Sequence, residues 1–256
     1  MSAIDSPVVK GLDFHYDDSP QDSPAWLAVK RGRIGASSLY KWLAVSKAKA
    51  TAGKPLKARL DYEKELMFER QFNTSFEHYQ NSAMQDGKDF EQWAAEQYEQ
   101  QTQTRLERVG CWYNEFFAAS PDRKMVDKPG GTEIKILKDN SFLDVLANKK
   151  VMQENDWEVI EKLADSSAVK KHWTQIQGQL WATGWEYVDY VPVNFNSGQV
   201  AIIRIKPSKT FHEYLALSVQ EQIVAEEFNT DNIYPIIGEV PMLAVNNSDD
   251  VGEGGW

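Results

Sequence analysis

The sequence has a single cysteine, Cys111, and no long apolar run. One cysteine cannot form an internal disulfide, a thiolate zinc site or a four-cysteine iron–sulfur cluster, so any metal ion must be held by oxygen or histidine ligands. No stretch approaches the roughly 18 apolar residues that a membrane span needs, and the first residues show no basic start followed by an apolar segment. We therefore expect a soluble, cytoplasmic protein with no membrane contact.

Basic residues are in the minority, since 28 Lys and Arg face 38 Asp and Glu and the net charge is −10. This balance argues against a protein that coats nucleic acid non-specifically, because that affinity comes from lysines and arginines that displace counterions from phosphates. A local basic groove stays possible. Residues 46–59 contain basic residues and no acidic one, although a solvated loop is the simpler interpretation of such a stretch.

The length of 256 residues with 42% hydrophobic residues is enough for one sizeable core. Residues 1–24 are polar and predict an N-terminal arm, residues 25–243 predict a single domain, and residues 244–256 predict a flexible acidic tail. A docking peptide for a basic, apolar pocket of a partner is the alternative interpretation of that tail.

Hydrophobic periodicity and turn residues predict alternating helices and strands. Helices are expected at 37–45, 60–78, 86–103, 154–165, 170–184 and 208–228, and strands at 108–120, 132–137, 186–195 and 199–206. The first two strands should pair antiparallel across a turn at Pro129, Gly130 and Gly131. The pattern indicates an α/β (α+β) domain with a central mixed sheet flanked by helices.

Candidate metal ligands surround that turn. Glu133 and Lys135 are two residues apart in a strand and therefore share a face, while Ile134 points to the other side, and Asp122 lies across the hairpin. Two converging carboxylates suit Mg²⁺ or Mn²⁺, and a lysine beside such an ion can act on an attacking water or on a charged phosphoryl transition state. The spacing alone also arises by chance in exposed hairpins.

Two further polar residues lie on faces that should pack inward. Glu91 shares a helical face with Ala94 and Tyr98, where an ionised carboxylate is costly unless it is paired or bound to a cation. Gln177 shares a face with Trp173 and other apolar residues, so its amide needs a hydrogen-bond partner. Each of the two, taken alone, is more often an ordinary polar residue at the edge of a core.

Four sequence blocks, in order, resemble the PD-(D/E)xK nuclease superfamily, and within it the phage lambda exonuclease or YqaJ-like viral recombinase family. The blocks are "AWLAVKRGRIGASS" (25–38), "GKDFEQWAAEQYE" (87–99), "SPD" with "EIK" (120–135), and "QIQ" (175–177). They span most of the chain. The resemblance implies a restriction-endonuclease-like PD-(D/E)xK core.

The same resemblance implies a role for each matching residue. Asp122, Glu133 and the backbone carbonyl of Ile134 would ligate Mg²⁺, for which Mn²⁺ could substitute, and Glu91 would hold a second metal ion or a water. Lys135 would act on the nucleophilic water, and Gln177 would position water or substrate.

The family also implies a grip on the 5′-phosphate of a DNA end. Lys30 stands where the family has an arginine, and an ammonium cannot make the bidentate contact of a guanidinium. Arg31 and Arg33 lie close enough in sequence to share that role, and Ser37 would offer a hydroxyl.

The function expected from the resemblance is a metal-dependent exonuclease that degrades one strand of linear double-stranded DNA from the 5′ end and leaves a 3′ overhang for recombination. A toroidal homotrimer and a single-strand annealing protein are the implied partners. Two alternatives stay open: a restriction-type or RecB-like endonuclease, and a catalytically silent DNA-binding module on the same fold.

Overall fold

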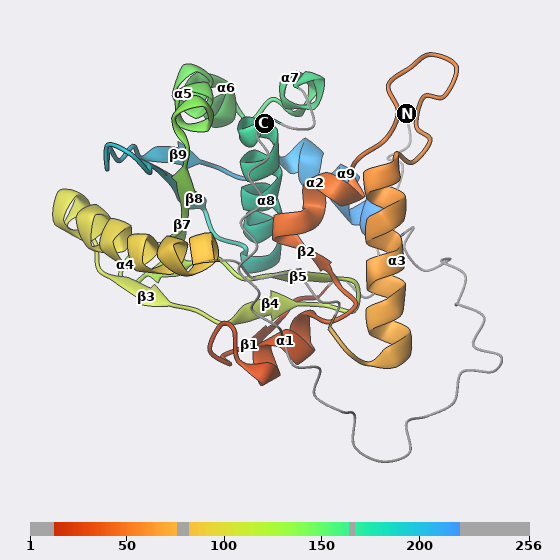
Figure 1. Ribbon diagram of the computed structural model, residues 1–256, viewed down its shortest axis with the longest axis horizontal. Helices are drawn as coiled ribbons and strands as arrows, with labels where there is room; N and C mark the ends of the chain where they lie inside the picture. Colours follow the sequence, from red (N-terminus) through yellow and green to blue (C-terminus); the bar gives the residue numbers. More distant parts are fainter. Residues whose placement is uncertain (1–12, 76–81, 164–166, 221–256) are drawn as a thin grey trace, which may run out of the picture.

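The computed structural model describes residues 13–75, 82–163 and 167–220 (Figure 1). The helices are α1 (Pro24–Lys30), the 3-10 helix η1 (Ala36–Ser38), α2 (Leu39–Trp42), α3 (Lys57–Phe72), α4 (Ser82–Thr102), α5 (Asp139–Ala147), α6 (Lys149–Glu154), α7 (Trp157–Lys162), α8 (Ala168–Thr183) and α9 (Lys209–Gln220). The strands are β1 (His15–Asp17), β2 (Ile34–Gly35), β3 (Leu106–Arg108), β4 (Cys111–Tyr113), β5 (Phe117–Ala119), β6 (Arg123–Met125), β7 (Gly130–Leu137), β8 (Tyr187–Asn194) and β9 (Ile203–Ile205).

A mixed five-stranded sheet carries the candidate site. Its order is β3-β6-β7-β8-β9, with β7 and β8 parallel and the other neighbours antiparallel. Parallel neighbours need a crossover connection, and α5 to α8 supply it. Every residue of β8 is buried, as expected for a strand covered on both faces. This mixed sheet flanked by helices confirms the expected fold class.

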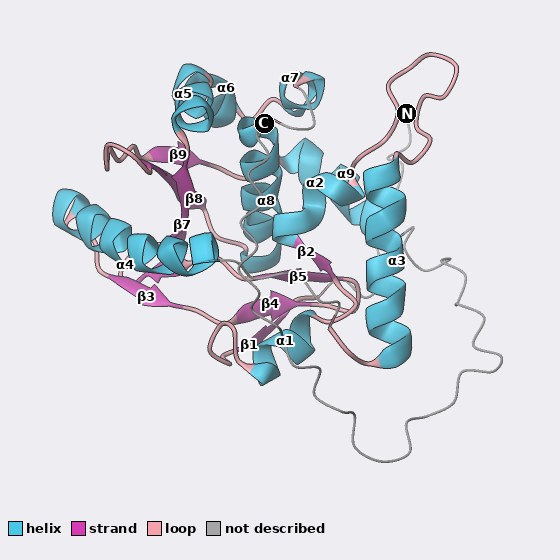
Figure 2. Ribbon diagram, viewed as in Figure 1, coloured by secondary structure: helices cyan, strands magenta, loops and turns pink. Residues whose placement is uncertain are grey.

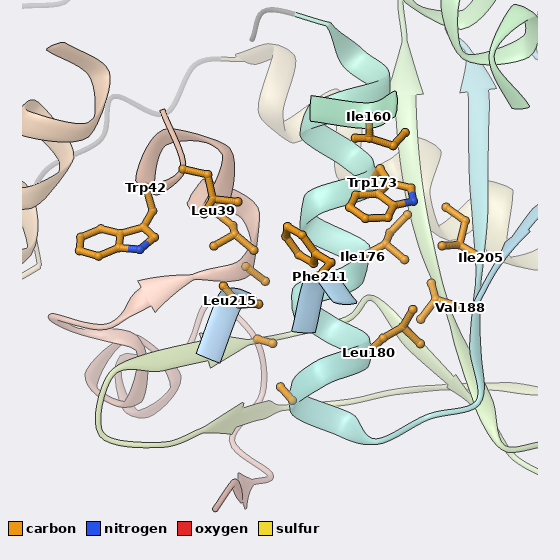
Figure 3. Close-up of a cluster of buried hydrophobic side chains, with 14 of the residues drawn as sticks. Leu39, Trp42, Ile160, Trp173, Ile176, Leu180, Val188, Ile205, Phe211 and Leu215 are labelled. Carbon is orange, nitrogen blue, oxygen red and sulfur yellow. The ribbon is translucent and has the colours of Figure 1, made fainter. Parts of the chain in front are cut away.

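Helix α8 lies at the centre of the main core, between the two sheets (Figures 1 and 2). Trp173, Ile176 and Leu180 project from it towards β8, β9, α2 and α9, and all three are fully buried (Figure 3). Helix α4 covers the opposite face of the five-stranded sheet with Ala94, Ala95 and Tyr98. The two faces of β7 therefore meet different helices.

The second sheet has the order β1-β4-β5-β2. Strand β1 pairs with β4, so part of the segment expected to be an arm belongs to this sheet. The close approach of β1 explains Gly110, where a Cβ atom would lie 2.0 Å from the carbonyl oxygen of Asp17. Helix α1 packs on this sheet through Trp26, which contacts Cys111 and Ala118.

Several expected elements differ from those observed. The prediction of one strand at 108–120 is wrong, because this segment is divided among β3, β4 and β5. The antiparallel neighbour of β7 is β6, not the segment 108–120. Asn114 makes the break, since its side chain accepts hydrogen bonds from the backbone of Phe116 at 2.9 Å and Phe117 at 2.8 Å. The turn before β7 precedes Gly130, which is already in the strand.

The helical segment expected at 154–165 is interrupted at Asn155, which adopts a left-handed conformation with φ 57° and ends α6. Helix α5 was not expected, and α4 begins at Ser82 rather than at residue 86. Within the described ranges, no helix is both long and apolar enough to cross a membrane. The tail at 244–256 lies outside the described residues.

Candidate active site

Strand β7 places Glu133 and Lys135 on the face of the sheet that meets α8. Their neighbour Ile134 points the other way and packs in the cluster formed with α4. This alternation confirms the expected orientation of the three residues. Glu133 is fully buried, whereas the Lys135 side chain retains 30% exposure, so the lysine reaches the solvent side of the site.

The Glu133 carboxylate is held by three donors. Gln175 and Gln179 of α8 donate from their Nε2 atoms to Oε1 and Oε2 of Glu133, each at 2.5 Å, and Lys135 Nζ lies 2.6 Å from Oε1. Because Gln175 and Gln179 are four residues apart, they lie on the same face of the helix. A buried carboxylate with such partners has a fixed position and orientation.

Asp122 immediately precedes β6 and reaches across to β7. Its Oδ2 accepts a hydrogen bond of 2.6 Å from the backbone nitrogen of Ile134. Burial and then the neighbouring Glu133 carboxylate raise the pKa of Asp122 well above its usual range. The site thus brings together two carboxylates whose negative charges repel each other.

Lys135 is the cation nearest to this pair in the described structure. Burial alone would lower the pKa of Lys135, but the Glu133 carboxylate and then Asp122 raise it above its usual range. The ammonium therefore keeps its charge at neutral pH.

Glu91 lies on α4 at the edge of the same site. Its Oε1 makes an ion pair of 2.8 Å with Arg123, and its charge contributes to the raised pKa of Asp122. Arg123 is thus the partner that the inward-facing Glu91 carboxylate requires. Glu91 and Glu133 are both close enough to Asp122 to act on it electrostatically.

Gln177 does not face the carboxylates. Its Nε2 donates to the carbonyl oxygen of Lys206 at 2.8 Å, and its Oε1 accepts from the backbone of Ser208 at 2.8 Å. Residues two apart on a helix point in different directions, so Gln175 and Gln177 cannot both reach Glu133. The choice of Gln177 for the site was therefore wrong, and Gln175 is the amide in that place. The i, i+4 pair of Gln175 and Gln179 is the signal that could have found it.

The oxygen atoms of this site bear on whether it can hold a divalent cation. Among the described residues no three His, Cys, Asp or Glu side chains are grouped tightly enough to form a metal site, because Glu133 is turned towards α8 and Glu91 towards Arg123. The oxygens of Asp122, Glu133 and the Ile134 carbonyl nevertheless suit Mg²⁺ or Mn²⁺ chemically. Burial and then the Glu133 charge raise the pKa of Asp122, and a bound cation would offset the repulsion between the two carboxylates.

The residues expected to bind a phosphate line one cavity of about 220 Å³. Lys30, Arg31, Arg33 and Ser37 contribute to its wall, together with Tyr62, Glu65 and Glu69 from α3. The structure therefore brings the basic residues of this block together.

Arg33 has its guanidinium occupied within the protein. Its Nε donates to the carbonyl oxygen of Asn114 at 2.6 Å and its Nη1 to that of Val29 at 2.5 Å. Arg31 Nη1 donates to Asn73 at 2.8 Å, while its buried Nε has no hydrogen-bond partner in the described structure. Arg31 thus has more capacity for a ligand than Arg33.

Lys30 connects this cavity with the carboxylates. Its Nζ lies 3.8 Å from the centre of the Trp26 ring, and the Trp26 indole donates to Ser120 at 2.8 Å, two residues before Asp122. Burial lowers the pKa of Lys30, and the nearby acidic groups, Glu133 among them, oppose that shift only in part. Lys30 is therefore within electrostatic range of Glu133.

The family model of the YqaJ-like viral recombinase domain matches residues 25–186, which include α1, the carboxylates and α8. The chain belongs to this family. No curated protein matches the chain.

Solved structures similar in fold to this YqaJ-like chain include proteins described as exonucleases. The alkaline exonuclease LHK-Exo from Laribacter hongkongensis is 22% identical, covers 78% of this chain and 90% of its own, and has a TM-score of 0.59. Its complex with dAMP has a TM-score of 0.60 at the same identity and coverage. A phage related exonuclease from Haemophilus somnus 129PT is 16% identical, covers 74% and 92%, and has a TM-score of 0.55. At these identities the likeness shows the shared fold.

Proposed function

We propose that this YqaJ-like protein is a metal-dependent exonuclease that degrades one strand of linear double-stranded DNA from a 5′-phosphorylated end and leaves a 3′ single-stranded overhang. The observation that carries the proposal is the group formed by Glu133, Lys135 and Asp122. The buried Glu133 carboxylate lies 2.6 Å from the Lys135 ammonium, and a second carboxylate, Asp122, with a raised pKa, lies directly before the adjoining strand β6. This is a donor set for phosphodiester hydrolysis.

Asp122, Glu133 and the Ile134 carbonyl would hold Mg²⁺ or Mn²⁺, with Glu91 available for a second ion or a bound water. When bound, the ion would supply positive charge to the phosphate and lower the pKa of a coordinated water. Lys135 would hold the attacking water and stabilise negative charge on the phosphoryl oxygens. Gln175 and Gln179 would keep Glu133 in the orientation that this chemistry requires.

The cavity beside the carboxylates would select DNA ends. A 5′-phosphate held by Lys30, Arg31 and Ser37 would align the first scissile bond with Asp122 and Glu133, which is a positioning effect. The short path from Lys30 through Trp26 and Ser120 to Asp122 supports this arrangement, because it fixes the distance between cavity and carboxylates.

Similar proteins support an exonuclease over the alternatives. The solved relatives are described as alkaline exonuclease and phage related exonuclease, and one of them was crystallised with dAMP. By the same resemblance we propose a toroidal homotrimer, a single-strand annealing protein as partner, and action in the cytoplasm of a host cell.

One experiment tests the proposal and its alternatives. The protein is incubated with Mg²⁺ and a linear duplex labelled at either end, bearing a 5′-phosphate or a 5′-hydroxyl, beside a covalently closed circle, and EDTA serves as the metal-free control. We expect nucleotides to be released from the 5′-phosphorylated strand while the circle stays intact. Nicking of the circle would indicate an endonuclease, and DNA binding without cleavage would indicate a silent module.

A further inference from the structure

A histidine and a tyrosine outside the expected motif lie next to Glu133 and Lys135. Tyr190 of β8 is the direct neighbour of Glu133 across the parallel pair, so both side chains lie on the α8 face. The Tyr190 hydroxyl lies 2.5 Å from Nδ1 of His172 on α8. His172 precedes Gln175 by three residues and Gln179 by seven, so the helical face that holds Glu133 also carries His172.

The direction of α8 determines where His172 lies along the strand. Strands β7 and β8 are parallel and α8 directly precedes β8, so the helix runs opposite to the strands and its first turns lie near the end of β7. His172 is therefore on the Lys135 side of Glu133. Its pKa agrees with this position, since burial and then the Lys135 ammonium lower the pKa of His172 to about 3.

The hydrogen bond to Tyr190 fixes which ring nitrogen carries the proton. Tyr190 is fully buried, and a buried hydroxyl needs a hydrogen-bond acceptor for its proton. Its hydroxyl keeps its proton, and Nδ1 of His172 is the acceptor that the described residues offer it. A neutral imidazole that accepts at Nδ1 has its hydrogen on Nε2.

The Nε2 atom has no hydrogen-bond partner among the described residues, and it is not one of their fully buried unpartnered atoms, since the His172 side chain is partly exposed. The charges of Lys135 and of the adjacent Lys171 both act on the His172 ring, and the Lys171 Nζ lies 4.9 Å from the centre of the Tyr40 ring. No described carboxylate pairs with Lys171. This edge of the site thus offers a hydrogen-bond donor within electrostatic range of Lys135 and Lys171, and this positive charge attracts a phosphate.

We infer that His172, oriented by Tyr190, donates a hydrogen bond from Nε2 to a phosphate oxygen of the substrate strand next to the scissile linkage. The inference rests on the proposed DNA hydrolysis and names a substrate contact that is separate from the Lys30 cavity. His172 is a substrate-binding residue in this arrangement, and Tyr190 is a positioning residue that acts through it.

The test combines variants with modified DNA. Initial rates are measured on a linear 5′-phosphorylated duplex that is unmodified or carries one neutral methylphosphonate at each of the first three linkages in turn. The variants are His172→Leu, His172→Gln and Tyr190→Phe, with His15→Leu on the exposed strand β1 as the matched control. Rates are divided by the folded fraction from circular dichroism.

On unmodified DNA we expect His172→Leu to be slower by about 10- to 100-fold, since it loses a hydrogen bond to a charged group. His172→Gln should recover part of the rate, because its amide places a donor near the position of Nε2. Tyr190→Phe should reduce the initial rate less than His172→Leu does, and the double variant should be no slower than His172→Leu alone. His15→Leu should match the wild type.

At one linkage the methylphosphonate should slow the wild type and add no further loss in His172→Leu, because the contact is already absent. An equal methylphosphonate penalty in both proteins at every linkage, or a wild-type rate in His172→Leu, overturns the inference. A wild-type protein that cleaves no linear DNA would instead overturn the proposed function. The two failures are therefore distinguishable.

Discussion

Two glutamines on α8 give opposite predictions although only one residue separates them. Gln175 donates to the buried Glu133 carboxylate, whereas Gln177 connects α8 with the chain after β9. Replacing each by leucine removes the amide and keeps a helix-forming side chain of similar size. We expect Gln175→Leu to impair cleavage by the folded protein and Gln177→Leu to impair folding.

The size of each effect depends on which polar groups lose a hydrogen-bond partner when the glutamine is replaced. Gln177→Leu leaves the buried N–H of Ser208 and the partly buried carbonyl of Lys206 without their partner, and an unsatisfied buried group costs about 1–3 kcal/mol, so we expect unfolding to be easier by about 2–4 kcal/mol. Gln175→Leu leaves Glu133 with Gln179 and Lys135. Removing a residue that orients a catalytic ligand typically costs about 10- to 100-fold in activity.

Urea unfolding followed by circular dichroism measures the first effect, and the initial rate on linear duplex DNA with Mg²⁺ measures the second. Rates are compared below the unfolding transition and divided by the folded fraction. The Gln177→Leu protein should then have nearly the wild-type rate, and the Gln175→Leu protein should not. The opposite result, a fully folded but inactive Gln177→Leu protein beside an active Gln175→Leu protein, would refute the assignment of the two amides.

Further predictions concern the carboxylate site, the cavity, acid stability and the tail. Asp122→Ala and Lys135→Ala should each abolish cleavage while DNA binding, measured by fluorescence anisotropy, persists; a wild-type rate in either would remove that residue from the site. Lys30→Ala should reduce the ratio of initial rates on 5′-phosphate and 5′-hydroxyl ends only in part, and Lys30→Arg should preserve it, because a guanidinium adds a second hydrogen bond; an unchanged ratio in Lys30→Ala would place the contact elsewhere. Burial lowers the pKa of His212 from 6.5 to about 4, so the unfolded chain takes up a proton at a higher pH than the folded chain does. The urea concentration at the unfolding midpoint should therefore decrease as the pH is lowered from 6.5 to 4, and an equal decrease in His212→Gln would contradict this cause. Deleting residues 245–256 should leave the exonuclease rate unchanged, and loss of activity in the shortened protein would mean that the tail is structural.

The parts of the site that the sequence predicted well are those set by local geometry. Alternation along a strand is enough to put Glu133 and Lys135 on one face and Ile134 on the other, whatever the rest of the chain does. The position of Asp122 followed from the same hairpin, even though the turn precedes Gly130 and the partner strand of β7 is β6. The family motif added the order of the blocks.

The sequence-based predictions that were wrong concern features that depend on contacts between distant segments. The sequence predicts correctly that the Gln177 amide, on an apolar helical face, needs a hydrogen-bond partner. It does not show that this partner is the backbone after β9. In the same way, the break between β3 and β4 lies at Gly110, where β1 approaches from almost a hundred residues away in the sequence. Such tertiary contacts override local propensity.

Lys30 stands where the resemblance implies an arginine, and the packing around Lys30 shows how a lysine is held at this position. The Lys30 ammonium lies over the Trp26 ring at 3.8 Å and its stem is half-buried, so its position is fixed by an aromatic face rather than by a bidentate hydrogen-bonding pattern. Trp26 is in turn held to Ser120, directly before the Pro121–Asp122 step. A phosphate bound by Lys30 would therefore be positioned relative to Asp122 by a continuous set of packed side chains. Arg31, whose buried Nε has no hydrogen-bond partner among the described residues, would be the group to add the directional contact that a lysine lacks.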